Sequence, residues 1–362
     1  MKIGIITHHY IKNFGAFLQV YALQEYLKSA FPNSETFIIN YIVSKHKIIN
    51  IGGYFRISLK NERPRSYFEK IKLISSFKNA ERKYLNLTKR VYSIEEINNQ
   101  NFDCIIIGSD EVWHYESDAI DPVKFSLGLK AKSIISYAPS SGSINLSHPI
   151  PDFVREGLSN FSFISVRDEL SEKLVEKVLG FKAVRVLDPT LMYKFPIIED
   201  AFTKRIKKEN YFLMYHCVGM PKELIEKIKS YCKRENLKIY GAGEYAAYYS
   251  DITVNMSPFQ WVEMFRNAKF ILSGTFHGAV FSIIMNKNFL MYLTPNNKSR
   301  STKVRSLLKQ FDIAERIIEE RNYFKIEKLF NSKINYEKVN GIRKIMENNS
   351  EQFIRNAIGM IN

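Results

Sequence analysis

Four short segments place polar side chains directly after an apolar run, where a loop could form a chemical site. They span residues 7–16, 107–113, 164–168 and 271–279. Together they carry carboxylates, an arginine and histidines, which are side chains that can bind anions and move protons. The sequence therefore indicates acid–base chemistry on a polar or anionic ligand.

The second segment puts two carboxylates, Asp110 and Glu111, after Gly108 and Ser109. Glycine permits close approach of the backbone to a ligand, and a carboxylate at the end of a strand could act as a base. A structural alternative is that Ser109 or Asp110 caps a following helix. The residue types allow both interpretations.

The third and fourth segments end in a cation and an imidazole. Arg167 closes an apolar run, so it either pairs with Asp168 or presents its guanidinium to a carboxylate or phosphate. His277 lies at a strand-to-helix turn beside Gly278, where it could shuttle protons or simply cap the turn. In the first segment, Asn13 and Gly15 precede a helix whose backbone N–H groups could face an anion.

Several common enzyme classes are disfavoured by missing motifs. The chain has no GxSxG elbow, no Walker phosphate loop and no dinucleotide fingerprint. It also lacks the HExxH spacing and CxxC pairs typical of metal sites, and its three cysteines cannot form a disulfide framework. We therefore expect no cofactor and no metal requirement.

The elements that must position these residues alternate between strand and helix. Short apolar runs typical of buried strands occur at residues 3–6, 104–107, 133–137, 163–166 and 183–187. Another strand is predicted at residues 36–41, after a helical pattern that ends at Ala30. A second series of strands is predicted at 211–216, 238–240, 270–273 and 289–293. Helices are predicted at 169–179 before Gly180, from Ser257 to Asn267, and near 66–85, 302–311 and 335–362.

This pattern predicts an α/β fold of two doubly wound, Rossmann-like domains that face each other across a cleft. We expect an N-terminal domain at residues 1–195 with a basic helical insertion at about 44–100, and a C-terminal domain at 205–315. Residues 316–362 are expected to form a helical tail that packs back on the first domain.

The 362-residue chain is basic, with 53 Lys and Arg against 37 Asp and Glu and a formal charge of +16. Between residues 44 and 90, thirteen basic side chains face only three acidic ones. Such a segment attracts polyanions or an anionic membrane, or is a solvated basic face. Nucleic acid is not expected, because nucleic-acid-binding signatures are missing. With no signal peptide or spanning segment in view, we expect a cytoplasmic protein, peripheral at the inner membrane face at most.

The segments taken in order resemble the polysaccharide pyruvyl transferase family. The matching pieces are Asn13-Phe14-Gly15-Ala16, Gly108-Ser109-Asp110-Glu111-Val112-Trp113, Ser136-Tyr137-Ala138, Ser165-Val166-Arg167-Asp168, Leu187-Asp188-Pro189-Thr190 and Phe276-His277-Gly278. The resemblance covers roughly residues 2–310. It implies a fold similar to the two-domain GT-B glycosyltransferases.

The resemblance also implies a reaction. Family members transfer a carboxyethylidene group from phosphoenolpyruvate onto two hydroxyls of a sugar, forming a cyclic ketal in capsular or exopolysaccharide biosynthesis. By position, His277 would be the acid or phosphate ligand and Asp110 the base. The substrate-binding residues would be Arg167, Asn13, Gly15, Ser109, Thr275, Gly278, Lys298 and Arg300.

One position departs from the pattern. Many members carry an arginine where this chain has Thr275, so Lys298, Arg300 or Lys303 would supply the missing contact with the donor anion. The partners implied are phosphoenolpyruvate and a sugar acceptor, which a polyprenyl diphosphate could carry at an anionic membrane. Two other hypotheses stay open: a GT-B nucleotide-sugar glycosyltransferase that uses Glu244 to bind the donor ribose, and a non-catalytic binding protein of the same fold.

Overall fold

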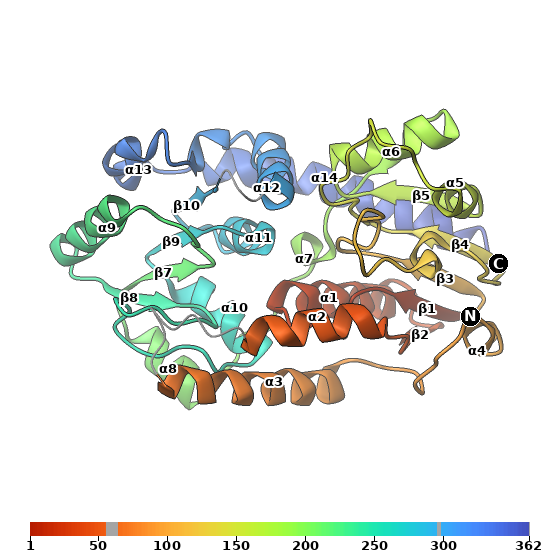
Figure 1. Ribbon diagram of the computed structural model, residues 1–362, viewed down its shortest axis with the longest axis horizontal. Helices are drawn as coiled ribbons and strands as arrows, with labels where there is room; N and C mark the ends of the chain where they lie inside the picture. Colours follow the sequence, from red (N-terminus) through yellow and green to blue (C-terminus); the bar gives the residue numbers. More distant parts are fainter. Residues whose placement is uncertain (56–63, 295–297, 362) are drawn as a thin grey trace. The chain divides into compact units, whose positions relative to one another are not determined.

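A computed structural model describes residues 1–55, 64–294 and 298–361 of the chain (Figure 1). These residues form two compact units. Unit 1 comprises Met1–Gly53, Glu81–Tyr193 and Arg343–Asn362, and unit 2 comprises Tyr54–Ala80 and Lys194–Ile342. Part of the expected basic insertion therefore belongs to unit 2, and the residues after 315 are divided between the two units.

Unit 1 is built on a six-stranded parallel sheet in the order β2-β1-β3-β4-β5-β6. Its strands are β1 (Lys2–Ile6), β2 (Glu35–Ile38), β3 (Cys104–Ile107), β4 (Ser133–Ser136), β5 (Phe163–Val166) and β6 (Val184–Arg185). Its helices are α1 (Phe14–Ala30), α2 (Ser44–Phe55, of which the last two residues fall in unit 2), α4 (Ile94–Asn98), η1 (Pro122–Phe125), α5 (Asp152–Ser159), α6 (Glu169–Leu179), α7 (Pro189–Met192) and most of α14 (Tyr336–Gly359).

The core of unit 1 explains why these runs become strands. All four residues of β3 are buried, as parallel strands covered on both faces require. On one side of the sheet, the rings of Trp113 and Phe125 stack at 5.7 Å within a large apolar cluster. The strand order is that of a doubly wound sheet, in which successive strands are added on one side of β1 and then, from β3 on, on the other side. The order therefore reverses between β1 and β3.

Unit 2 repeats this design with a five-stranded parallel sheet in the order β11-β10-β9-β7-β8. Its strands are β7 (Tyr211–Tyr215), β8 (Lys238–Gly241), β9 (Phe270–Ser273), β10 (Phe289–Tyr292) and β11 (Ile317–Ile318). Its helices are most of α3 (Pro64–Tyr84), α8 (Ala201–Lys207), α9 (Lys222–Arg234), α10 (Pro258–Asn267), α11 (Phe276–Ile284), α12 (Lys298–Gln310), η2 (Ala314–Arg316), η3 (Tyr323–Lys325) and α13 (Ile326–Asn331).

The sheet of unit 2 is also doubly wound, and its order reverses between β7 and β9. Phe212 and Phe270, on these two neighbouring strands, stack with ring centroids 5.3 Å apart in the core. No helix in the described ranges is both long and apolar enough to span a membrane.

Most predicted elements are confirmed, and the differences have local causes. Gly180 ends α6 in the left-handed conformation, and Ser257 caps α10, both as expected. The strand expected at 36–41 ends at Ile38, because the chain turns just after it. The Tyr41 N–H bonds to the Ile39 carbonyl at 2.7 Å, and the Asn40 carbonyl accepts the Val91 N–H at 3.2 Å. Helix α2 was not predicted, since its Gly52-Gly53 pair is unfavourable in a helix.

Candidate functional site

The carboxyl ends of β1 and β3 lie side by side where the strand order of unit 1 reverses, which is where doubly wound sheets bind ligands. The loops that follow these strands are joined by hydrogen bonds. Thr7 Oγ1 donates to the Ser109 carbonyl at 2.8 Å, and Ser109 Oγ donates to the Ala138 carbonyl at 2.9 Å. Ser109 is fully buried, so its hydroxyl holds the loops in place.

Asp110 presents a half-buried carboxylate at this edge. Its Oδ1 accepts the Glu111 N–H at 2.8 Å and lies 3.8 Å from Nη2 of Arg167. Residues 111–121 form turns and bends, so Ser109 and Asp110 do not cap a helix and that alternative is wrong. The expected role of Asp110 as a base stays a prediction.

Arg167 is buried and pairs with Asp188 rather than with its neighbour Asp168. Its Nη1 donates to Asp188 Oδ2 at 2.7 Å. Asp168 instead caps α6, accepting the Ser171 N–H at 3.0 Å. Since two carboxylates, Asp188 and Asp110, lie close to one guanidinium, much of the Arg167 charge is balanced within the protein.

Asn13 and Gly15, the residues expected to precede a helix and face an anion, lie at the start of α1. Asn13 is the N-cap, and its Oδ1 accepts the Ala16 N–H at 3.1 Å. Gly15 is the second residue of α1 and is buried. The Asn13 side chain therefore satisfies one of the amides that could otherwise have faced an anion.

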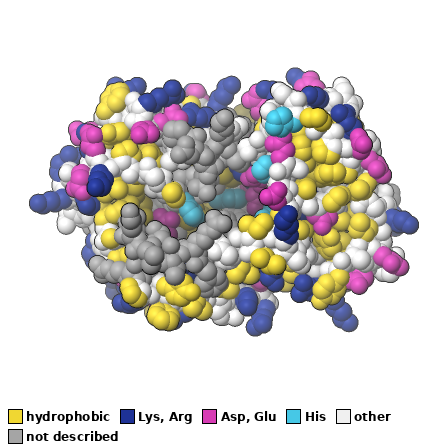
Figure 2. Space-filling model, in the orientation of Figure 1, with side chains coloured by type: hydrophobic (Ala, Val, Ile, Leu, Met, Phe, Trp, Pro, Cys, Tyr) yellow, Lys and Arg dark blue, Asp and Glu magenta, His cyan; other side chains and the backbone are white. Residues whose placement is uncertain are grey.

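A buried lysine beside these loops was missed by the sequence analysis. The Nζ of Lys124, in η1, lies 3.1 Å from Nδ1 of His8 and 3.5 Å from the hydroxyl of Tyr10. The signal was present, because Lys124 stands between Val123 and Phe125 in an apolar stretch. On the face drawn in Figure 2, histidine and acidic side chains lie next to one another.

In unit 2, the candidate residues lie at the carboxyl end of β9, again where the strand order reverses. Thr275 is the N-cap of α11, and its hydroxyl accepts the Gly278 N–H at 3.0 Å. Gly278 leaves no room for a side chain, because a Cβ there would collide with Ser273. Thr275 and Gly278 thus fix the start of the helix that carries His277.

His277 is the second residue of α11 and is half-buried, with its ring edge-on to that of Phe276 at 5.3 Å. Its position places an imidazole where the helix dipole favours an anion. Lys298 and Arg300 begin α12, but their side chains lie outside the described residues.

Glu244, the carboxylate considered for a donor ribose, is engaged within unit 2. Its Oε1 accepts a hydrogen bond from the hydroxyl of Tyr249 at 2.9 Å, and both its oxygens lie 3.1 Å from the His216 N–H. These contacts tie Glu244 to the end of β7 and give it a structural role there.

Comparison with known proteins identifies the family. The sequence profile described as polysaccharide pyruvyl transferase matches residues 13–297, a range that includes Asp110, Arg167 and His277. The chain belongs to the polysaccharide pyruvyl transferase family. The expected resemblance is confirmed, and this family membership supports a transferase. A search of curated proteins gave no match.

Solved structures show the fold of this family member. A UDP-N-acetylglucosamine 2-epimerase is 10% identical with a TM-score of 0.54, covering 98% of this chain and 94% of that chain. The S. aureus MnaA–UDP complex is 10% identical with a TM-score of 0.51, covering 93% and 90%. The glycosyltransferase SnogD from Streptomyces nogalater is 10% identical with a TM-score of 0.49, covering 100% and 99%. The expected α/β fold with two doubly wound, GT-B-like domains is confirmed.

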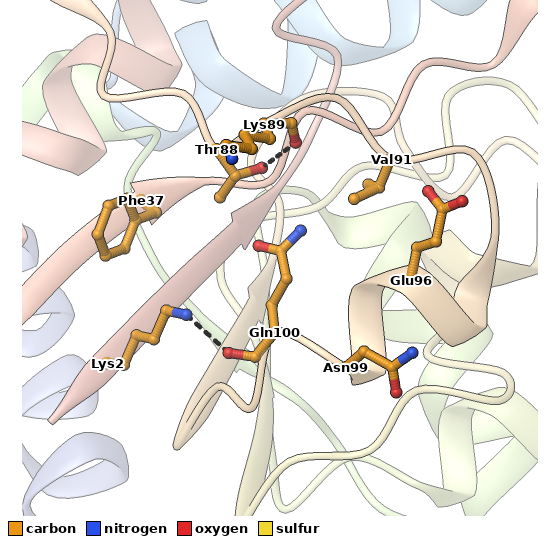
Figure 3. Close-up of a pocket in the computed structure, with 8 residues that line it drawn as sticks. All are labelled: Lys2, Phe37, Thr88, Lys89, Val91, Glu96, Asn99 and Gln100. Atoms are coloured by element: carbon orange, nitrogen blue, oxygen red, sulfur yellow. Dashed lines mark hydrogen bonds between the residues drawn. The ribbon is translucent and has the colours of Figure 1, made fainter.

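A cavity of about 460 Å³ lies elsewhere in unit 1, toward the amino end of β1 (Figure 3). Lys2 and Phe37 line it, together with Lys89 and Gln100. The Lys2 ammonium is already bonded to the Gln100 carbonyl at 2.6 Å. Because ligands of doubly wound sheets bind at the carboxyl ends of the strands, we do not assign the reaction to this cavity.

Proposed function

We propose that this protein transfers a carboxyethylidene group from phosphoenolpyruvate onto two hydroxyls of a sugar, forming a cyclic ketal during capsular or exopolysaccharide assembly. The observation that carries the proposal is the family match over residues 13–297, together with Asp110 and His277 at the reversal points of the two sheets. In this proposal phosphoenolpyruvate is the donor and no cofactor takes part.

The reaction needs a base, an acid and a site for anions. Asp110 takes the proton from the attacking hydroxyl, whose oxygen bonds to C2 of the donor while the C3 methylene gains a proton and becomes a methyl group. The C2–O bond to phosphate then breaks, the second hydroxyl bonds to C2, and its proton leaves with the phosphate. His277 donates the proton to C3 or holds the leaving phosphate. Positioned acids and bases of this kind contribute about 10²- to 10⁴-fold each.

The charges of each unit support a division of roles. At the edge of unit 1, the three carboxylates of Asp110, Glu111 and Asp188 outnumber the two basic side chains, Arg167 and Lys124, and this negative excess suits a neutral sugar better than a multiply charged donor. The start of α11 in unit 2 favours anions. We therefore assign the acceptor hydroxyls to Asp110 and the donor phosphate to His277, with Lys298 and Arg300 as further donor ligands.

The experiment is incubation of the pure protein with phosphoenolpyruvate and candidate lipid-linked sugars, followed by mass spectrometry and a phosphate assay. We expect the sugar to gain one carboxyethylidene group for each phosphate released. Asp110→Asn and His277→Ala should each lower the rate by about 10²- to 10⁴-fold. The exposed residues Asp118 and His148 provide the matched controls Asp118→Asn and His148→Ala.

Parallel incubations with nucleotide sugars, and a measurement of ligand binding, give two outcomes that would contradict the proposal. Glycosyl transfer from a nucleotide sugar, without ketal formation, would identify a glycosyltransferase instead. Ligand binding with no turnover, unaffected by Asp110→Asn and His277→Ala, would identify a binding protein.

We further propose that the acceptor is carried on a lipid and that α3 contacts an anionic membrane. On α3, Phe68 is 62% exposed and Ile71 is 46% exposed, on the same face as the exposed Lys72. Exposed apolar side chains beside lysines and arginines are typical of helices that lie at a membrane surface. Vesicles containing anionic lipid should bind the protein in a flotation assay, and Phe68→Ser should weaken this binding. Equal flotation with neutral and anionic vesicles would contradict the proposed contact of α3 with an anionic membrane.

A further inference from the structure

His216 lies where the strand order of unit 2 reverses, beside the turn that carries His277. It directly follows Tyr215, whose carbonyl accepts the Gly274 N–H at 2.9 Å, so the loops after β7 and β9 begin side by side. A Cβ at Gly274 would lie 2.4 Å from the His216 carbonyl oxygen, which shows how closely these two loops pack. The fold therefore brings a second imidazole to the edge of the sheet where His277 begins α11.

The backbone of His216 has a conformation that favours glycine. Its φ is +53°, in the left-handed region, which residues with a side chain adopt only at a cost. Such residues cluster at sites of binding and catalysis, where the surrounding structure holds them in place. Because a glycine would fit this turn more easily, the histidine indicates that the chain uses the imidazole.

Glu244, in the loop after β8, holds His216 in this conformation. Both of its carboxylate oxygens accept the His216 N–H at 3.1 Å, and its Oε1 also accepts a hydrogen bond from the hydroxyl of Tyr249 at 2.9 Å. Its Oε2 is 4.0 Å from Nδ1 of the imidazole, a distance at which the negative charge attracts a protonated ring. The His216 side chain is 44% exposed, so it is accessible to a ligand at this edge.

We propose that His216 is the general acid that protonates C3 of phosphoenolpyruvate, while His277 at the start of α11 holds the phosphate. This inference rests on the proposed function, which assigns the donor phosphate to His277 because the start of a helix favours anions. With His277 on the phosphate, another group must supply the proton to C3. His216 supplies it from the neighbouring loop, with Glu244 beside its imidazolium.

The proposed step balances in protons and electrons. A proton moves from the His216 imidazolium to C3, and the electron pair of the C2–C3 double bond forms the new C–H bond. C2 becomes electron-deficient and bonds to the acceptor oxygen, whose proton passes to Asp110. His216 then regains a proton from solvent and Asp110 loses one to solvent, so both residues return to their starting forms.

The test measures ketal formation by variants of the full chain. Asparagine tolerates the left-handed backbone, so His216→Asn removes the imidazole and retains the turn. Its kcat should fall by about 10²- to 10⁴-fold with the KM for phosphoenolpyruvate little changed, whereas His277→Ala should also raise this KM. Asn286→Gly is the matched control, because Asn286 is exposed and also left-handed, with a φ of +51°, and its kcat should equal that of the native protein.

His216→Gly is the second variant, and it decides the question even if His216→Asn does not fold. Glycine relieves the backbone and leaves space for a free imidazole, so added imidazole should restore part of the lost kcat in this variant and have no effect on Asn286→Gly. An unchanged kcat in the His216 variants, or a loss that imidazole does not restore, would overturn the inference. In either case ketal formation by the native protein would still support the proposed function. If the native protein forms no ketal, the proposed function fails and this inference fails with it.

Discussion

The pair formed by Arg167 and Asp188 shows how much one buried contact can matter at the scale of a single residue. Their side chains are 3% and 0% exposed, and Asp188 Oδ2 accepts a hydrogen bond from Nη1 of the Arg167 guanidinium at 2.7 Å. Asp188 Oδ1 also accepts the Thr190 N–H at 3.1 Å, so the same carboxylate starts α7. Removing one partner would leave a buried charge with its compensation lost.

Arg167→Met should therefore lower the free energy of unfolding by about 3–5 kcal/mol. Urea denaturation of both proteins measures the difference. Arg185→Met is the control, because its ion pair with Glu172 is partly exposed and 3.6 Å long, and such pairs contribute about 0–1 kcal/mol. Equal losses in the two variants would show that the Arg167 pair is no stronger than a surface pair.

His9 gives a second prediction at this scale, on pH. Burial lowers its pKa from 6.5 to about 4. Between these values the unfolded chain binds a proton that the folded protein does not, so stability falls as the pH drops from 6.5 through 4. His9 accounts for roughly 3 kcal/mol of this loss in the free energy of unfolding. In His9→Gln the loss of stability across this range should be smaller by that amount, whereas the exposed His148→Gln should follow the native protein.

At the scale of elements, the start of α11 decides where His277 points. Thr275 supplies the N-cap, and the helix follows β9 after only Gly274 and Thr275. A Cβ at Gly274 would collide with the His216 carbonyl, so the end of β7 holds this turn closely. Thr275, which stands where the family resemblance implies an arginine in many members, thus caps the helix that carries His277.

Thr275→Ala should destabilise the protein by about 0.5–2 kcal/mol, because the Gly278 N–H loses its acceptor. Thr275→Ser retains a hydroxyl and should cost much less. Hydrogen exchange at the Gly278 amide measures the local effect, which should be faster exchange in Thr275→Ala only. Similar protection in all three proteins would mean that the cap is not needed to start α11.

At the scale of the whole molecule, each unit is assembled from distant parts of the chain. The last residues of α14 belong to unit 1, where Ser350 Oγ accepts the Leu187 N–H at 2.9 Å. Ile354 and Ile358 on the same helix are almost fully buried. Unit 1 therefore cannot complete its core until the end of the chain is present.

Deletion of residues 343–362 should weaken unit 1 selectively. We expect faster hydrogen exchange in β4 and β5 and unchanged exchange in β7 and β9, because this segment belongs to unit 1. Ser350→Ala is the milder control, since it removes only the hydroxyl that accepts the Leu187 N–H and donates to the Met346 carbonyl, and each such hydrogen bond is worth about 1 kcal/mol. Equal loss of protection in the strands of both units would contradict independent cores.

The sequence by itself determined most strands and helices and several of their ends. Apolar runs such as residues 104–107 predict buried strands, and Ser257 and Gly180 mark helix ends, because each signal acts over only a few neighbouring positions. The alternation of strand and helix then limits the fold to doubly wound sheets. The order of the motifs was sufficient to predict the family.

Only the tertiary structure decided which side chains meet. Arg167 pairs with Asp188, 21 positions away in the sequence, and Lys124 contacts His8, 116 positions away. These pairings depend on the order in which the strands join, which places the loops after β1 and β3 together although Thr7 and Ser109 are 102 positions apart. No local pattern encodes that order, because it is set by the burial of whole sheet faces, so a lysine within an apolar stretch reveals its neighbours only in the folded protein.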